Sequence, residues 1–425
     1  MDVSIEEFVD RLVSDEAYKD SVHSCEIEEL DEEMRLPDWY DEKKFNQGKK
    51  FFFNFIYGFL TVLMVGTIAL LSVPTTINVL VGSRRANSKY TAYKRYVSTF
   101  FHFLCWLQND IKPGSVSWKS LQTVRRRHLQ SDRAAKLKGQ GTISQRDVSL
   151  TLFCLSVGFP ILKPDKFSIY QLEDGDWEGY IHFWGVISYM LGLQDRYNIC
   201  RGTFEETRQI CQRIRDRVYT PCLENVPEYF EHSVHVILEG TGTIVPGLEV
   251  QAMLYLTKNI AEVPGYIYTE SERIQLQSKL RKHLKGKSPD TGVESTALMK
   301  KSAIDGLPKA LPNILYLHDY DTVENSPAYK ILPFIAKYRL AVLRITLTLY
   351  STNIGRLLLN LYSRWLLFIA QNFPYVAMWR FGFKNAFIDM FREDPTDDTI
   401  PRPNAEFYKP RPPEPWYKCL FDILW

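Results

Sequence analysis

The chain has 425 residues, and its 45% hydrophobic and 14% aromatic content can fill one large core or two smaller ones. Its 52 lysines and arginines nearly balance its 50 aspartates and glutamates, so the net charge of +2 gives no reason to expect a nucleic acid as partner. The seven cysteines are odd in number, widely spaced and without a Cys-x-x-Cys pair, which argues against a structural zinc site or a disulfide framework.

The chain begins with an acidic segment, residues 1–48, which we expect to be an N-terminal arm. It reads as a short acidic helix followed by a polar stretch. Within it, the strip "LPDWYDEKKF" carries Trp39, Tyr40 and Phe45, three aromatic side chains that can be buried against a body.

A long uncharged run follows, because no charged residue occurs between Lys50 and Arg84. As one helix, Phe51 to Leu71 would span about 30 Å, the thickness of a bilayer core. The run therefore predicts either a transmembrane helix or a fully buried helix. Gly58 and Gly66 suit close helix packing in the second case, and hydropathy alone leaves both interpretations open.

Residues 49–285 are expected to form one large helical domain. From Tyr90 onward apolar residues recur at intervals of three and four, and no sustained alternation of period two occurs, so the class predicted is all-α. Further helices are predicted at 117–137, 145–158, 178–192, 203–219, 227–238, 247–260 and 270–285. Residues 286–328 are polar and are expected to form a loop.

The next segment, residues 329–395, predicts basic, apolar C-terminal helices. No acidic residue occurs from Asn325 to Ile388, while lysines and arginines lie among leucines, tryptophans and phenylalanines. Amphipathic helices of this kind lie readily on anionic lipid, but a core-facing helix pair with a solvated basic face gives the same pattern. Residues 396–425 are a proline-rich tail whose apolar end, "WYKCLFDILW", is expected to dock on the body or a membrane.

Three helices carry histidines that could take part in chemistry. Arg95, Thr99 and His102 share one helix face, His128 follows three arginines, and His182 lies on a strongly apolar helix and is expected to point into the core. A histidine on such a face is more often a satisfied core residue than a ligand. A single histidine is nevertheless enough to supply one axial nitrogen to haem iron, and no short metal motif is then needed.

Four stretches carry a family resemblance: "RYVSTFFHFL", "SWKSLQTVRRRHLQSDRA", "ISQRDVSLTLF" and "YIHFWGVISYMLGLQDRYNICRG". In that order they resemble successive helices of the rubber oxygenases, or latex clearing proteins, and the ER-bound oxygenases of the mycophenolic acid pathway. The resemblance covers about residues 40–265. It implies an all-α fold with a large globin-like helical domain, to which the sequence itself adds the hydrophobic N-terminal helix and the basic amphipathic C-terminal helices.

The resemblance also implies a site. His128 matches the axial ligand of haem b and is thus the metal ligand, and Arg95 and Thr99 match the pair on the side where dioxygen binds as co-substrate. Thr151 and His182 match positions in the surrounding shell. The haem would supply the oxidative chemistry, while Arg95 would steer bound oxygen.

Several positions depart from the family pattern. Ser98 stands where the bacterial members have a lysine able to cap the iron, so no amine would close the site. Asp132 occupies the spacing at which an arginine is expected after the axial histidine, and Tyr189 and Phe153 replace histidines of the shell. These departures make rubber itself an unexpected substrate.

The first functional hypothesis is a membrane-associated, haem-dependent oxygenase acting on an isoprenoid or other lipid-like substrate. The absence of an Asn-x-Ser/Thr acceptor fits a body on the reducing, cytosolic side of the endoplasmic reticulum. A second hypothesis is a non-catalytic helical membrane protein that keeps the fold without the cofactor. A third, a non-haem iron site using His128 and His182 with a carboxylate, lacks a supporting His-x-x-Glu or Glu-x-x-His spacing.

Overall fold

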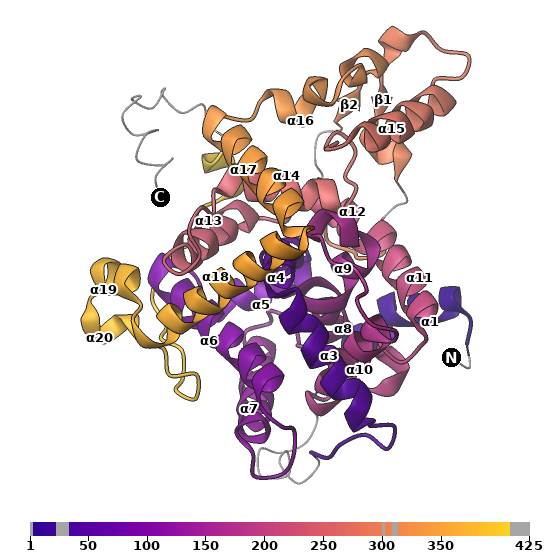
Figure 1. The fold of residues 1–425 in the computed structure, drawn as a ribbon. Helices are drawn as coiled ribbons and strands as arrows, with labels where there is room; N and C mark the ends of the chain where they lie inside the picture. Colours follow the sequence, from indigo (N-terminus) through magenta and orange to yellow (C-terminus); the bar gives the residue numbers. More distant parts are fainter. Residues whose placement is uncertain (1–2, 23–33, 300–301, 308–312, 409–425) are drawn as a thin grey trace.

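The computed structural model describes residues 3–22, 34–299, 302–307 and 313–408 (Figure 1). This part of the chain is helical almost throughout, and the strands within it are one short antiparallel pair, β1 (Val293–Glu294) and β2 (Ile314–Leu315). The prediction of an all-α fold is confirmed. The apolar end of the tail, residues 416–425, lies outside the described residues.

The helices up to the middle of the chain are α1 (Ile5–Val13), α2 (Asp15–Lys19), α3 (Glu42–Asn54), α4 (Ile56–Leu71), α5 (Pro74–Gly82), α6 (Lys89–Gln108), α7 (Val116–Leu137), α8 (Gln145–Leu152), the π-helical turn η1 (Phe153–Val157), α9 (Gly158–Leu162), η2 (Pro164–Phe167), α10 (Asp176–Met190) and η3 (Asp195–Tyr197). Ser88, Ser115 and Ser144 cap α6, α7 and α8, each by accepting a hydrogen bond from a first-turn amide.

The remaining helices are α11 (Phe204–Ile214), the π-helical turn η4 (Arg215–Tyr219), α12 (Thr220–Glu224), α13 (Phe230–Thr241), α14 (Val250–Ile260), α15 (Glu270–His283), η5 (Pro289–Thr291), η6 (Ser295–Leu298), η7 (Leu317–Tyr320), η8 (Val323–Asn325), α16 (Pro327–Lys330), α17 (Phe334–Tyr350), α18 (Asn353–Asn372), α19 (Tyr375–Phe381), α20 (Phe383–Ala386) and η9 (Asn404–Glu406). The segment predicted as a polar loop thus contains short turns and both strands. They pack on α15 through a small cluster that includes Leu280, Leu315 and Tyr320.

The uncharged run from Phe51 to Leu71 is divided between two helices. α3 ends at Asn54 and α4 begins at Ile56, with a bend of 90° between them. Phe55 at the break is fully buried, and its ring packs edge-on against Tyr170 at 4.8 Å. The expectation of one continuous helix over this run is therefore wrong, because burial of Phe55 at the corner sets the two directions. In the described residues, no single helix is long and apolar enough to cross a membrane, although this bent pair passes the same test of length and composition.

α4 lies at the centre of the helical body, where most of its side chains are buried. It packs against η1, α14, α13, α9 and α18. A Cβ atom added at Gly66 would come 1.8 Å from the carbonyl oxygen of Cys154 in η1, so only glycine allows this approach. The close packing expected of Gly66 is observed here.

The N-terminal arm is bound to the body by packing and charge. Phe8, Val9 and Leu12 of α1 are buried, and α1 packs on α11 and α8. Acidic side chains of the arm meet basic ones of the body in the pairs Glu6–Arg213, Asp10–Arg217 and Glu16–Arg196. Further along, Phe45 is buried against Phe183 of α10, with ring centroids 4.8 Å apart.

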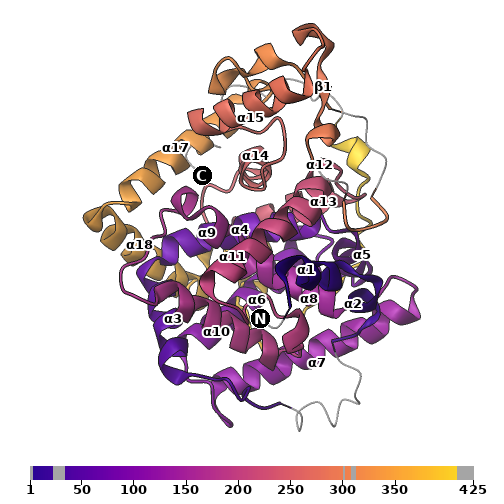
Figure 2. The same cartoon turned by 90° about the vertical axis from the view of Figure 1, so that its right-hand side faces the viewer.

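The C-terminal helices α17 and α18 lie on a different face of the body from the N-terminal arm. Figure 1 shows α17 and α18 crossing in front of α4, and Figure 2 shows the same pair along one edge of the molecule. They diverge from a short connecting turn, and α17 packs on α14 while α18 packs on α4. Residues 386–408 then return across α6 and α13, held by hydrogen bonds such as Ser88 and Thr91 to Asp397 and Asn404 to Pro227.

We expect Gly66→Ala to destabilise the fold. Alanine favours a helix over glycine by about 1 kcal/mol, but the new methyl group would collide with the Cys154 carbonyl, and such overpacking costs about 1–3 kcal/mol. Thermal unfolding should therefore show a lower Tm. Ala134→Gly, at an exposed site on α7, is the control for helix preference alone. A Tm raised by Gly66→Ala would contradict the packing described here.

Candidate functional site

A cavity of about 280 Å³ lies between α5, α6, α7, α8 and α10, and we call it the His128 cavity. Its walls bring together four of the residues that the resemblance places at the site: Arg95, Thr99, His128 and Thr151. They come from three helices, α6, α7 and α8. His102 also lines this cavity.

His128 presents an unpartnered imidazole. Its Nδ1 atom is buried without a hydrogen-bond partner, and its Nε2 atom forms no hydrogen bond with a described residue. Burial, followed by the charges of Arg95 and other arginines nearby, lowers the pKa of His128 to about 4. The ring is therefore neutral near pH 7 and has a lone pair available for a ligand.

Arg95 and Thr99 occupy successive turns of α6. The Arg95 guanidinium donates to the Ser83 hydroxyl at 3.1 Å, and the Thr99 hydroxyl donates to the Arg95 carbonyl at 2.9 Å. The cation that lowers the pKa of His128 is thus held at the cavity wall by the turn after α5.

His102 differs from His128 because both of its ring nitrogens have partners. Nδ1 lies 2.7 Å from the Ser120 hydroxyl, and Nε2 lies 3.3 Å from the Arg127 guanidinium. Burial and the charge of Arg127 lower the pKa of His102 to about 4. Ser98, one turn before, is buried and accepts a hydrogen bond from Arg127 at 3.4 Å. Neither side chain is free to bind a ligand without losing these contacts.

Thr151 is hydrogen-bonded to Asp147, an acidic residue of the cavity that was not among the predicted site residues. The Thr151 hydroxyl donates to the carbonyl of Asp147, whose carboxylate lines the His128 cavity and accepts from Thr75 and Ser144, each at 2.7 Å. Burial raises the pKa of Asp147 despite these donors. The signal in the sequence was the Ser144–Asp147 spacing, a capping box before an apolar run.

His182 lies away from this cavity. It is half-buried, its Nε2 accepts a hydrogen bond from the Asp41 amide at 3.0 Å, and it lines a separate hollow with Trp39 and Arg201. Its ring meets the N-terminal segment instead of the core, contrary to the expected orientation. The structure thus does not bring His128 and His182 together, and the described residues contain no group of three His, Cys, Asp or Glu that could hold a metal ion.

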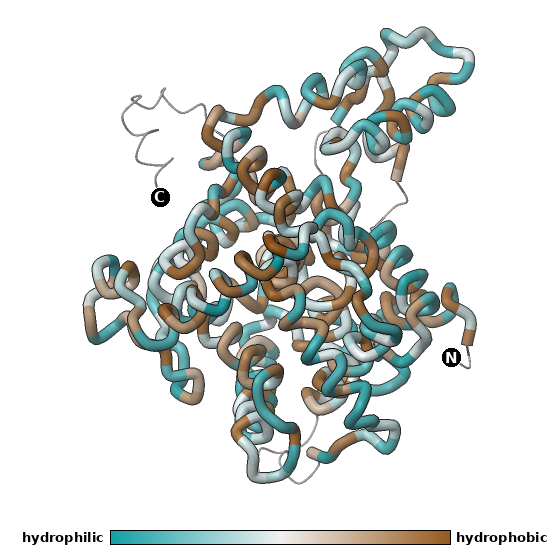
Figure 3. The backbone as a smooth tube through the Cα atoms, in the orientation of Figure 1, coloured by the Kyte–Doolittle hydropathy of each residue, from teal (hydrophilic) through white to brown (hydrophobic). Residues whose placement is uncertain are grey.

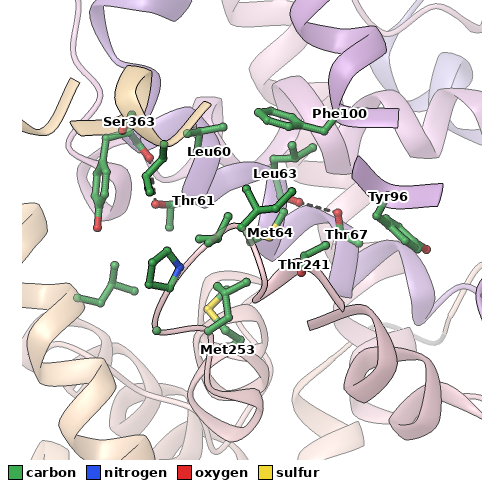
Figure 4. A pocket seen from close by; sticks show the side chains of 18 of the residues that line it. Leu60, Thr61, Leu63, Met64, Thr67, Tyr96, Phe100, Thr241, Met253 and Ser363 are labelled. Atoms are coloured by element: carbon green, nitrogen blue, oxygen red, sulfur yellow. Dashed lines mark hydrogen bonds between the residues drawn. The ribbon is translucent and has the colours of Figure 1, made fainter. Parts of the chain in front are cut away.

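A second, apolar cavity of about 420 Å³ adjoins the first. Figure 4 shows its lining side chains, among them Leu60, Leu63 and Met64 of α4 and Phe100 of α6. The two cavities share the lining residues Leu70, Tyr96, Thr99, Phe103 and Leu155. A molecule in the apolar cavity can therefore contact Thr99, which also lines the His128 cavity.

The residues of the His128 cavity fit a haem in donor chemistry. A neutral, unpartnered imidazole is a suitable axial ligand, and the guanidinium groups of Arg85, Arg95 and Arg127 lie in the same walls and suit carboxylates such as propionates. The volume of this cavity, about 280 Å³, is just below the range of about 300–1,000 Å³ that is usual for small-molecule sites.

Comparison with known proteins gives limited information. No protein-family model matches the chain, and no curated protein matches it. A solved structure, latex clearing protein in the closed state, is similar at 19% sequence identity with a TM-score of 0.43, over 63% of this chain and 74% of that one.

The neutral histidine of the cavity should make stability depend on pH. Its pKa is lower in the folded chain than in the unfolded one, so between about pH 6.5 and pH 4 the unfolded state binds a proton that the native state does not. Stability is then lost as pH falls through this window, by up to about 3 kcal/mol for His128 at about 1.4 kcal/mol per pKa unit.

We expect His128→Gln to flatten the dependence of unfolding free energy on pH between 6.5 and 4, relative to the unmodified chain. Urea unfolding at a series of pH values measures this difference, in which contributions from other groups cancel. His283→Gln, at an exposed position of α15, is the matched control and should leave the slope unchanged. An unchanged slope for His128→Gln would mean that its imidazole is solvated.

Proposed function

We propose that this chain is a membrane-associated, haem-dependent oxygenase acting on an apolar, isoprenoid or lipid-like substrate. The observation that carries the proposal is the unpartnered, neutral imidazole of His128 in a cavity that adjoins a larger apolar one. A ligand site with one free basic nitrogen and an apolar approach suits a cofactor that performs the oxidation and a substrate without polar handles.

Each residue of the His128 cavity then has a distinct role. His128 would hold the haem iron through a ring nitrogen, and the haem, when bound, would supply the activation of dioxygen. Arg95, held by Ser83, places a positive charge on the cavity wall, and its own helix α6 contains no acidic residue. This charge would orient an anionic or polar oxygen species. Thr99, exposed to both cavities, would mark the boundary between substrate and cofactor.

Asp147 adds a group that can hold a proton in the same cavity. Because burial raises its pKa, its carboxyl group retains a proton at higher pH than an exposed aspartate does. Thr75 and Ser144 fix its position by hydrogen bonds. It is therefore the candidate acid of the site, a role for which no carboxylate could be chosen from the sequence.

The cellular location is proposed as the membrane of the endoplasmic reticulum, with the helical body on the reducing side. The described cysteines Cys105, Cys154, Cys200, Cys211 and Cys222 are all buried free thiols, which is compatible with a reducing compartment. The basic, acid-free C-terminal helices support attachment to an anionic membrane surface.

Absorption spectroscopy tests the haem directly. We expect the full chain, extracted from membranes, to show a Soret band with stoichiometric iron, and we expect His128→Ala to lose both. His182→Ala should keep them, because His182 lies in another hollow. Loss of the band in the His182 variant alone would show that the axial assignment is wrong. The complete absence of a Soret band would favour the non-catalytic alternative, and iron without a Soret band would favour a non-haem site.

If His128 holds a haem, the part of the cavity beside Arg95 should be open to external ligands. Ser98 cannot act as a strong ligand, and both nitrogens of His102 have partners, so cyanide should bind to the ferric protein quickly. We expect Arg95→Ala to weaken cyanide binding about tenfold or more, the usual effect of losing a charge-assisted hydrogen bond, while the Soret band remains. Arg126→Ala on the exposed face of α7 is the control. A six-coordinate, low-spin resting spectrum that resists cyanide would contradict the open site.

A further inference from the structure

The pair α17–α18 has two apolar faces with different surroundings. On the inner face, residues three or four positions apart line the apolar cavity: Arg339, Leu343 and Thr346 on α17, and Leu359, Ser363 and Leu366 on α18. Side chains at such intervals share one side of a helix. These two helices thus form one wall of the cavity.

The outer face of the same pair is apolar and exposed. Its exposed large side chains are Phe334, Ile345, Leu349, Ile354, Leu357, Leu358, Leu361, Trp365 and Phe368, and α19 adds Trp379, which is 87% exposed. Figure 3 shows this concentration of hydrophobic residues along both helices. An exposed apolar surface of this extent is typical of contact with a membrane or a partner.

Charge favours a membrane over a second copy of the chain. Residues 325–388 contain no acid, and their exposed bases are Lys330, Arg344, Arg364, Arg380 and Lys384, of which Lys330 and Arg380 also pair with Asp319 and Glu239. Two copies joined through this face would bring like charges together, whereas long basic side chains around an apolar surface can reach anionic headgroups. The complementary occupant is therefore an anionic lipid bilayer.

Two residues connect the outer face with the cavity. Val342 of α17 is 38% exposed and Tyr362 of α18 is 41% exposed, and both also line the apolar cavity. They therefore lie where the wall meets the surface, one on each helix.

We propose that the apolar cavity takes one hydrocarbon chain of a membrane lipid, which enters laterally from an anionic bilayer between Val342 and Tyr362. The route deepens the proposed oxygenase function and rests on it only for what happens to the chain after entry. The polar end of the lipid would stay near the basic side chains of the outer face. The chain end would reach Thr99, where the two cavities meet.

Vesicle flotation tests the outer face with the full chain. We expect binding to vesicles of phosphatidylcholine with phosphatidylserine, and weaker binding to phosphatidylcholine alone. The double variant Leu357→Glu, Leu361→Glu should lower the affinity about tenfold or more, because both side chains are exposed and neither lines the cavity. Leu137→Glu, at an 89% exposed position on α7, is the matched control. Equal binding to both vesicle types overturns the proposal. So does a chain that binds no vesicles but forms a dimer, if the double variant dissociates that dimer.

Uptake of a fluorescent polyene fatty acid from the same vesicles tests the cavity. Thr346 and Thr348 form a matched pair on α17, since each hydroxyl donates to the carbonyl four residues earlier, at 2.8 and 2.9 Å, but only Thr346 lines the cavity. We expect Thr346→Trp to reduce uptake about tenfold or more and Thr348→Trp to leave it unchanged. Val342→Trp, at the partly exposed entrance, should slow uptake and serves if Thr346→Trp does not fold.

The failures of the two proposals are distinguishable, because vesicle binding and uptake require no haem. Uptake that is equal in Thr346→Trp, Val342→Trp and the unmodified chain overturns the lateral route, whatever the absorption spectrum. If these variants block uptake and the chain shows no Soret band, the result supports the lateral route and contradicts the proposed oxygenase function. If the chain shows a Soret band but takes up no fatty acid, the result contradicts the lateral route and still supports the oxygenase function.

Discussion

Both cavities depend on the close contact between α4 and the π-helical turn η1. The contact is possible because Gly66 has no side chain where the Cys154 carbonyl approaches. η1 continues α8, so this contact also fixes the helix that carries Asp147 and Thr151. Leu155 of η1 lines both cavities, which places the irregular turn at their junction. π-helical turns often occur at functional sites, since the extra residue redirects neighbouring side chains.

The sequence predicted the grouping around His128 better than it predicted the path of the chain. Arg95 and Thr99 share a face because four residues make about one helical turn, and the capped helices α6 and α7 are regular enough for this rule to hold. The inclusion of His128 and Thr151 rested on a resemblance. The corner at Phe55 left no local signal, because it depends on contacts with Tyr170 and Arg356, more than a hundred residues away.

Two errors of interpretation have the same physical origin. His182 was expected in the core because its helix is apolar on nearly all sides, yet its ring accepts a hydrogen bond from the Asp41 amide of a distant segment. The Ser144–Asp147 spacing predicts only a capping box, so it gives no indication that the Asp147 carboxylate lies at a cavity. In both cases tertiary contacts decide the surroundings of a polar group, and neither hydropathy nor spacing describes those contacts.

The contacts of the site distinguish two histidines whose pKa values are both lowered to about 4, His102 and His128. Arg127 donates to the carbonyl oxygens of Met390 and Arg392, so the returning C-terminal segment holds its guanidinium beside His102. His102 has the Arg127 guanidinium beside it, whereas the buried Nδ1 atom of His128 has no hydrogen-bond partner. Both rings are neutral, but they differ in whether a nitrogen is available to bind a ligand. His102 is committed to the protein, whereas His128 keeps its lone pair for a ligand. The residues that make this difference come from α6, α7 and the segment after α20, so the site is complete only when the C-terminal part of the chain lies on the helical body.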